Sequence, residues 1–382
     1  MNKSVGLKFY IDNNISPVHQ DISDLEKHFQ VRSSLYRLLG LPSHFFRSQN
    51  ILEVAAGSGH NSLFISSLIP NSYDICEPNP IAVQDIKNLY NDLSIPHTRP
   101  RIFTQRLEDF LEEESYDIVI CEGWLGGLKK YEQDMLKKLA RFVVKDGILI
   151  LTFFPPIGGI SSFLRRLMAF RIISIDDDIN SQTEILCSAF SSHLNTLSSI
   201  SRTHQHWLQD CLLNPHIYVG PLSPNICFDV LGNEFAIYNS VPKLAHDWRW
   251  YKSLYGNSRE FNLQFLKSYD AACHNLIDYR FVYNNRDIND NRKLESLCFD
   301  LIKNAKRYDT SGYSAYKEHI AAILKSIIDN IDCAELRETT TALSEAAALL
   351  ECQHISPEAI ANMKYFSSLF GREQCYMSFI RY

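Results

Sequence analysis

Glycine and carboxylate residues that could bind a nucleotide-type cofactor lie close together near residue 55. Gly57 and Gly59 follow a short apolar run and precede an amphipathic one. Glycines at such a junction let the backbone turn tightly and approach a ligand closely, while the amides that start a helix can bind a carboxylate or a phosphate. Glu77 ends the next apolar run, where a carboxylate can accept hydrogen bonds from both hydroxyls of a ribose. These residues indicate a site for an adenosine cofactor.

A nicotinamide dinucleotide fits this segment less well than other adenosine cofactors do. Ser62 stands where the dinucleotide fingerprint has its third glycine. An NAD or nucleotide-sugar enzyme stays an alternative. So does a purely structural turn, in which Gly57 and Gly59 serve the bend and Glu53 and Glu77 are solvated strand ends.

Alternating apolar and amphipathic segments predict the elements that position these residues. The expected buried strands are 51–55, 73–77, 101–105, 116–121 and 147–154. The expected helices between them are 61–68, 80–93, 107–113 and 131–143. Five strand–helix repeats in order predict an α/β fold with a doubly wound, mostly parallel Rossmann-like sheet. Pro155, Pro156, Gly158 and Gly159 then break the pattern.

The remaining segments predict additions to this sheet. At the N-terminus we expect a strand at 9–11 and a helix at 21–39 that Asp21 caps. A helical insertion at 160–213 follows strand five, and a hairpin at 226–239 turns at Gly232 and Asn233. From residue 258 onward helical periodicity dominates. The predicted parts are a lead-in or cap segment (1–47), a cofactor domain (48–155), a helical insertion (156–225), a hairpin with an aromatic segment (226–257) and a helical C-terminal region (258–382).

Residues 48–155 resemble the class I S-adenosylmethionine-dependent methyltransferases. The first motif of that family is an acidic residue, three positions and Gly-x-Gly after strand one, which Glu53, Gly57 and Gly59 match. Glu77 matches the ribose-binding acid of the family, and the hairpin is expected to supply its antiparallel sixth and seventh strands. The resemblance implies S-adenosylmethionine as cofactor and S-adenosylhomocysteine as product. The implied cofactor contacts are Glu53, Ala55, Gly57, Gly59, Asn61, Glu77, Pro78, Leu107, Glu108 and Glu122.

Methyl transfer makes few demands on side chains, because the sulfonium carbon is already activated and the protein mainly aligns the acceptor and excludes water. A hydroxyl acceptor benefits from a base, and the candidates are Glu122, His60 and His206. Glu122 is favoured as a ligand of the cofactor amino group instead, and His60 can face the methionine end or solvent. His206 and Asp210 lie one helical turn apart, in a cap over the acceptor or in an ordinary packed helix. No Cys or Glu completes a zinc motif with them, so no metal is expected.

Composition limits the function further. The net charge of -6 and the pI near 6.1 argue against duplex nucleic acid as partner. The ten cysteines form no CxxC pair, which favours reduced thiols and a cytoplasmic location. No apolar run reaches the ~20 residues of a membrane span, so membrane insertion is not expected.

The acceptor is the least defined part of the prediction. The large insertion and extra helices favour a bulky acceptor, first a hydroxyl of a glycan or metabolite and second a protein side-chain nitrogen. A third interpretation is a non-catalytic cofactor-binding module that assembles with partners through its C-terminal helices. The same helices could also join copies of this chain into a homo-oligomer. The run 247–251, Asp-Trp-Arg-Trp-Tyr, could bind a planar or sugar ligand or form a structural aromatic cluster. The segment 16–21 is expected to fold over the cofactor, as in many proteins of the resembled family.

Overall fold

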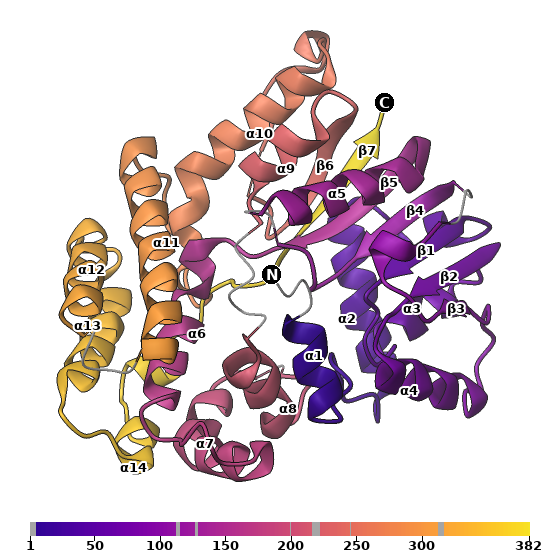
Figure 1. Ribbon diagram of the computed structural model, residues 1–382. Helices are drawn as coiled ribbons and strands as arrows, with labels where there is room; N and C mark the ends of the chain where they lie inside the picture. Colours follow the sequence, from indigo (N-terminus) through magenta and orange to yellow (C-terminus); the bar gives the residue numbers. More distant parts are fainter. Residues whose placement is uncertain are drawn as a thin grey trace. The chain divides into compact units, whose positions relative to one another are not determined.

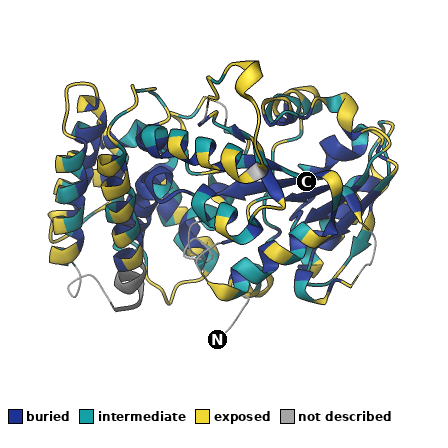
Figure 2. Cartoon of the chain, turned by 90° about the horizontal axis from the view of Figure 1, so that it is seen from above, coloured by how far each residue is buried: buried dark blue, intermediate teal, exposed yellow. Residues whose placement is uncertain are grey.

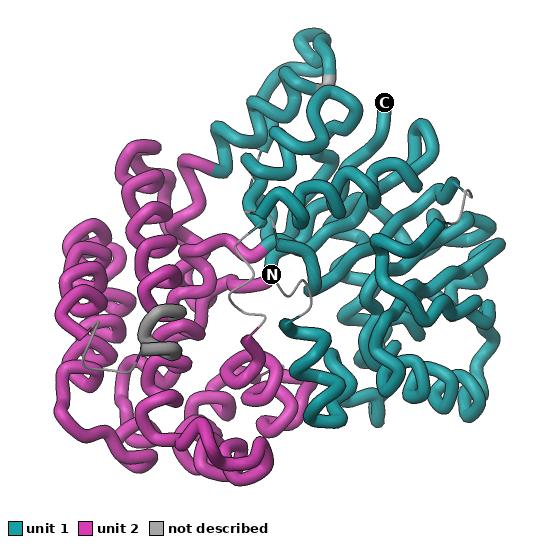
Figure 3. Tube along the Cα trace, viewed as in Figure 1, with its two compact units in different colours: residues 1–153, 219–269, 375–382 teal, residues 154–218, 270–374 magenta. Residues whose placement is uncertain are grey.

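The chain forms two compact units, coloured separately in Figure 3. The computed structural model describes residues 5–111, 115–126, 129–198, 200–215, 222–244, 246–311 and 317–382. At 258 and 306–311 it describes the backbone only. The sheet unit comprises Met1–Phe153, Val219–Tyr269 and Cys375–Tyr382, and the helical unit comprises Phe154–Tyr218 and Asp270–Gln374. Each unit is therefore built from stretches of chain that are distant in the sequence.

A seven-stranded sheet forms the centre of the sheet unit, in the order β3-β2-β1-β4-β5-β7-β6 (Figure 1). The strands are β1 Asn50–Val54, β2 Ser72–Cys76, β3 Arg101–Phe103, β4 Tyr116–Cys121, β5 Val143–Phe153, β6 Phe235–Val241 and β7 Cys375–Arg381. β1 to β5 pair in parallel, while β7 runs antiparallel to both β5 and β6. This arrangement confirms the predicted fold class, a mostly parallel Rossmann-like sheet.

The register of three strands places the candidate residues at one edge of the sheet. Val54 pairs with Cys76 of β2 on one side and with Cys121 of β4 on the other. The chain therefore leaves β1, β2 and β4 at the same level. The strand order reverses between β1 and β4, and ligands of open α/β sheets collect outside the carboxyl ends of strands at such a point.

Helices cover both faces of this sheet. The helices of the sheet unit are α1 Val5–Asp12, α2 Leu25–Leu38, α3 Ser62–Ser67, α4 Pro80–Asn91, α5 Lys130–Phe142, α9 Pro224–Leu231 and the first part of α10 Ser258–Ala272. Ile51, Ile75 and Ile118 share one hydrophobic cluster with side chains of α2, α3 and α4. Alternate strand residues such as Leu52 and Val119 point to the other face and are also fully buried. Figure 2 shows the strands largely in the colour of buried residues.

The outer strand β6 is covered by a side chain of α10. The Asn262 side chain accepts a hydrogen bond from the Ile237 amide (2.7 Å) and donates one to the Phe235 carbonyl (2.9 Å). These bonds satisfy backbone groups that an unprotected edge strand would present to another chain. The α10 helix thus protects part of the sheet edge at β6.

The helical unit surrounds a buried arginine. Its elements are α6 Pro156–Ala169, α7 Ile179–Leu194, α8 His204–Leu208, the π-helical turn η3 Gln209–Leu213, α11 Ile288–Ser311, α12 Lys317–Asn330, α13 Arg337–Glu351, α14 Pro357–Ala361 and the short 3-10 turns η6 Cys273–Leu276 and η8 Phe366–Ser368. Arg165 donates to the carbonyls of Leu369 (2.9 Å) and Phe366 (3.2 Å), and its guanidinium lies 3.7 Å from the Phe370 ring centroid. No helix in the described stretches is long and apolar enough to cross a bilayer.

The N-terminal predictions need two corrections. Residues 9–11 belong to α1, since three apolar residues fit a helix as well as a strand and the local pattern cannot separate them. Asp24, not Asp21, caps α2: its side chain accepts from the Lys27 amide at 2.9 Å. Asp21 binds the Ser23 amide and hydroxyl one turn earlier.

The predicted hairpin at 226–239 is half wrong. Its first half is α9, which Ser223 caps and Pro224 opens at the first helical position, both ordinary helix-start signals. Its second half is β6. The partner of β6 is β7, at the end of a region in which helical periodicity was expected to dominate. In the third predicted helix, Leu107–Asp109 is a 3-10 turn (η2), and residues 112–114 lie outside the described part.

Candidate functional site

A tight turn joins β1 to α3 and contains the two predicted glycines. The backbone φ is +62° at Ala55, +58° at Gly57 and +80° at Gly59, all in the left-handed region. A Cβ on Gly57 would lie 2.7 Å from the Pro17 carbonyl oxygen, and one on Gly59 would lie 2.7 Å from Ile86 Cγ1. Both the conformation and the space therefore require glycine at these positions.

Glu77 connects this glycine turn to the end of β2. Its Oε2 accepts from the Gly57 amide at 2.9 Å and its Oε1 accepts from the Asn79 amide at 2.8 Å. Burial, opposed by these two hydrogen bonds, raises the pKa of Glu77 to about 7. Because a carboxylate can accept about four hydrogen bonds, each oxygen keeps acceptor capacity for a hydroxyl.

Glu53 lies at the end of β1 and is 4% exposed. The Tyr73 hydroxyl of β2 donates a short hydrogen bond to its carboxylate. Burial raises the pKa of Glu53, and the negative charge of Glu122 raises it further. Glu53 thus serves at least to connect β1 to β2 beneath the glycine turn.

Glu122, which follows β4, is bound by two residues of α2. Arg32 donates to Oε2 at 3.1 Å and to Oε1 at 2.6 Å, and the Tyr36 hydroxyl donates to Oε1 at 2.9 Å. Both members of the ion pair have side chains less than one tenth exposed. Burial opposes the charge of Arg32, but Glu122 keeps the pKa of its guanidinium above the ordinary value.

Sequence reasoning missed Arg32 and Tyr36. Both lie on the predicted lead-in helix, one turn apart, and only the structure shows that Arg32 is buried and pairs with a distant acid. Their bonds occupy several acceptor positions of Glu122. Either predicted role of Glu122, binding the cofactor amino group or acting as a base, would have to share the carboxylate with these bonds.

His60 lies among other polar groups beside the glycine turn. Its Nδ1 is 2.5 Å from Ser58 Oγ, and its ring centroid is 4.7 Å from that of His19. The His28 ring bonds the His60 carbonyl at 3.1 Å, and burial lowers the pKa of His28. The structure thus places three histidines at this corner, of which the sequence indicated only one as a candidate.

The N-terminal segment 15–19 lies directly on the glycine turn. The Ser58 amide donates to the Pro17 carbonyl at 2.9 Å, and the Ser58 hydroxyl donates to the Val18 carbonyl at 3.0 Å. The Asn79 side-chain amide donates to the Ile15 carbonyl at 3.0 Å. Ser58, which follows Gly57, and Asn79, two positions after Glu77, are therefore tied to this segment.

The residues predicted near the adenine lie after β2 and β3. Pro78 is half-buried next to Glu77, and Leu107 is buried in η2. The Glu108 carboxylate accepts from the Tyr131 hydroxyl of α5 at 2.7 Å. Glu108 therefore has a side-chain partner within the protein. Asn61 immediately precedes α3 and makes no side-chain capping bond there.

His206 lies in the other unit. It is part of α8, where its amide binds Thr203 Oγ1 at 3.2 Å. Asp210, its expected neighbour, pairs with Arg202 at 2.5 Å. The hydrogen bonds of α8 and η3 thus fit the packed-helix interpretation. Within the described residues, no three His, Cys, Asp or Glu side chains are grouped so that they could hold a metal ion.

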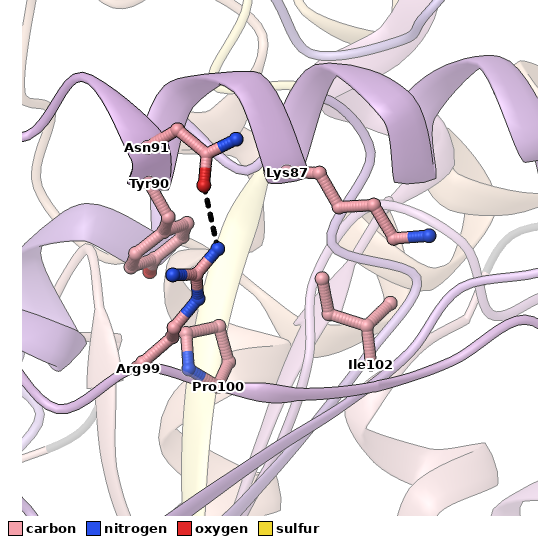
Figure 4. Close-up of a pocket in the computed structure, with 6 residues that line it drawn as sticks. All are labelled: Lys87, Tyr90, Asn91, Arg99, Pro100 and Ile102. Atoms are coloured by element: carbon pink, nitrogen blue, oxygen red, sulfur yellow. Dashed lines mark hydrogen bonds between the residues drawn. The ribbon is translucent and has the colours of Figure 1, made fainter.

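A cavity of about 340 Å³ lies elsewhere in the sheet unit, between α4 and β3 (Figure 4). Arg99 donates to the Asn91 side chain at 2.6 Å within it. The lining residues are Lys87, Tyr90, Asn91, Arg99, Pro100 and Ile102. None of them is a predicted site residue, so this cavity is separate from the glycine turn.

No protein-family model matches the sequence, and no curated protein aligns with it. Solved structures that align with part of the chain include methyltransferases. The N-methyltransferase NodS from Bradyrhizobium japonicum WM9, in complex with S-adenosyl-L-homocysteine, is 13% identical; 39% of this chain and 74% of that chain are covered, with a TM-score of 0.31. PKMT2 from Rickettsia typhi is 14% identical, with 59% and 45% covered and a TM-score of 0.36. An S-adenosylmethionine-dependent methyltransferase from Mesorhizobium loti is 12% identical, with 34% and 56% covered and a TM-score of 0.28.

These alignments are partial on both sides. The chain spans about half the length of the first structures that it matches, 44% of one and 58% of another. The likeness concerns the fold alone. By its strand order and its glycine turn after β1, the sheet unit has a Rossmann-like α/β fold.

Proposed function

We propose that the sheet unit binds S-adenosylmethionine at the glycine turn and that the chain transfers its methyl group to an acceptor. The observation that carries this proposal is the hydrogen bond of 2.9 Å from the Gly57 amide to Glu77. It brings the bend after β1 and the carboxylate after β2 into one site, as a bound adenosine requires.

The residues present fit this cofactor. The left-handed φ at Gly57 and Gly59 bends the backbone so that the amides at the start of α3 can face a ligand, while Pro17 and Ile86 fill the space beside the two glycines. Glu77 would accept hydrogen bonds from the ribose hydroxyls with its remaining lone pairs. Leu107 and Glu108 would border the adenine. When bound, the cofactor supplies a sulfonium methyl carbon that needs no further activation.

The chain's own groups would mainly orient and dehydrate the reaction. Glu122 would bind the amino group of the cofactor, and Arg32 and Tyr36 would hold the Glu122 carboxylate in place. The N-terminal segment 15–19 would cover the site and keep water out. If the acceptor is a hydroxyl, His60 is placed beside the turn as the group that could take its proton.

For the acceptor, we propose a hydroxyl of a glycan or metabolite, with a protein side-chain nitrogen as the alternative. The support is the size of the helical unit, which exceeds what methyl transfer to a small amine needs. A non-catalytic binding module is the third candidate. Methyl turnover with fractionated extracts separates them: label that migrates with protein would reverse the order of the first two, and binding without turnover would favour the third.

Calorimetry with S-adenosylmethionine and S-adenosylhomocysteine tests the site itself. We expect Glu77→Ala to weaken binding by ~1–3 kcal/mol, because hydrogen bonds from the ribose to a charged group are lost. Asp92→Ala is the matched control, since Asp92 is an exposed acid at the other end of α4. An affinity of Glu77→Ala for these two compounds equal to that of the natural chain would refute the proposed function.

A further inference from the structure

An exposed group of large side chains follows β6 in the sheet unit. We name residues Trp248–Tyr255 the aromatic segment. The exposed fractions are 91% for Trp248, 63% for Trp250, 69% for Tyr251, 46% for Leu254 and 93% for Tyr255. Soluble proteins bear such residues singly, and a contiguous group marks an interaction surface. Trp250 and Tyr251 contact each other edge to face, with ring centroids 5.6 Å apart, but the exposed fractions show that this cluster is not buried.

The charge around the aromatic segment is positive. From Asp247 to Glu260 the sequence contains the three basic residues Arg249, Lys252 and Arg259 and the two acidic residues at its ends, which leaves a net charge of +1. Asp247, just before the aromatic segment, is neutralised by hydrogen bonds from the Arg249 guanidinium, one of them 2.9 Å long. The Lys252 ammonium lies 4.7 Å from the Trp250 ring centroid and 5.8 Å from that of Tyr251. The apolar and basic groups thus occupy the same short stretch.

We propose that the aromatic segment docks on the headgroup region of an anionic lipid bilayer. Trp and Tyr rings prefer this region because it accepts both their apolar faces and their polar edges. Lys252 and Arg259 can keep their charges at anionic phosphates while their alkyl stems lie against the apolar layer. The docking is peripheral, and it needs no membrane-spanning helix.

The exposure of the rings favours a bilayer over a sugar. A sugar-binding platform needs ring faces held in fixed positions by neighbouring side chains. Trp248 and Tyr255, more than nine tenths exposed, have few such neighbours. A fluid headgroup layer accepts rings in many orientations, so it does not require this support.

Vesicle flotation of the purified full chain tests the proposal. Vesicles of phosphatidylcholine with and without phosphatidylglycerol are compared. We expect binding to the anionic vesicles, and a loss of about tenfold or more in the partition coefficient for Trp248→Ala/Tyr255→Ala. Val31→Ala/Leu111→Ala is the matched control, because it removes two exposed apolar side chains elsewhere in the sheet unit. Lys252→Glu should weaken binding to anionic vesicles and leave binding to neutral ones nearly unchanged.

Three results would overturn the proposal. One is absence of flotation with anionic vesicles, and another is equal loss of binding in the control pair and in Trp248→Ala/Tyr255→Ala. The third is binding of a soluble oligosaccharide, abolished by the same aromatic substitutions, without any binding to vesicles. Circular dichroism of each variant shows whether the fold is retained.

Discussion

Arg32 and Glu122 are 90 positions apart in the sequence and form a nearly buried ion pair in the sheet unit, joined by two hydrogen bonds. The pair fastens α2 to the chain that leaves β4. Since Tyr36 donates to the same carboxylate, three side chains hold this corner of the candidate site. The lead-in helix is therefore part of the site's framework.

Breaking this pair from one side should be costly. We expect Arg32→Met to lower the free energy of unfolding by ~3–5 kcal/mol, because Glu122 is left buried with its charge uncompensated. The double variant Arg32→Met/Glu122→Gln should recover part of that loss, since no charge remains buried. Urea unfolding measures both. Arg37→Met, on the exposed side of α2, is the control and should change stability little. If the double variant is no more stable than Arg32→Met, the unpaired charge of Glu122 is not the cause of the lost stability.

Much of the sheet could be predicted, because β1, β2, β4 and most of β5 are buried and appear in the sequence as apolar runs separated by amphipathic ones. β7 could not. Its seven residues, Cys375–Arg381, pair with β5 and β6 more than 130 positions earlier, and nothing local distinguishes them from a helical segment. α9 was missed for a different reason, namely that a short apolar run carries no clear period.

The residues of the candidate site likewise fall into those that the sequence predicts and those that only the tertiary structure shows. Gly57 and Glu77 could be predicted because each has a local signature, a turn between a strand and a helix and an acid at a strand end. The pairing of Glu122 with Arg32 depends on how α2 packs, which the sequence alone does not specify. The contacts of segment 15–19 with Ser58 are likewise tertiary.

The buried Glu77 carboxyl should make stability depend on pH. Its pKa is about 7 in the folded chain, against 4.5 for an ordinary solvated glutamate, so the folded state keeps a proton that the unfolded state releases. This stabilisation is complete below pH 4.5 and is lost as the pH rises through about 7, by roughly 3 kcal/mol in all. Urea unfolding across this range, compared between the natural chain and Glu77→Gln, isolates the contribution. Parallel curves for the two proteins would contradict the prediction.

Gly57 and Gly123 offer a matched comparison of two left-handed glycines. Gly57 has a φ of +58° and no room for a Cβ, whereas Gly123 has a φ of +78° and nothing within 4 Å of that position. We expect Gly123→Ala to cost only the conformational ~1–2 kcal/mol. Gly57→Ala should cost at least about 1 kcal/mol more, because the methyl group displaces the Pro17 carbonyl. Thermal unfolding compares the two, and equal losses would show that segment 15–19 yields without cost.

Removal of residues 1–20 should lower the affinity for S-adenosylmethionine. The deletion leaves α2 and the Arg32–Glu122 pair intact, but it takes away the segment that contacts Ser58 and Asn79 on either side of Glu77. A cofactor that this segment no longer covers should dissociate faster, and most of the change in affinity should appear in the dissociation rate. Stopped-flow binding measures the two rates separately, and a urea curve confirms that the shortened chain is folded. A folded variant with unchanged dissociation would mean that the segment packs on the glycine turn without ever covering the ligand.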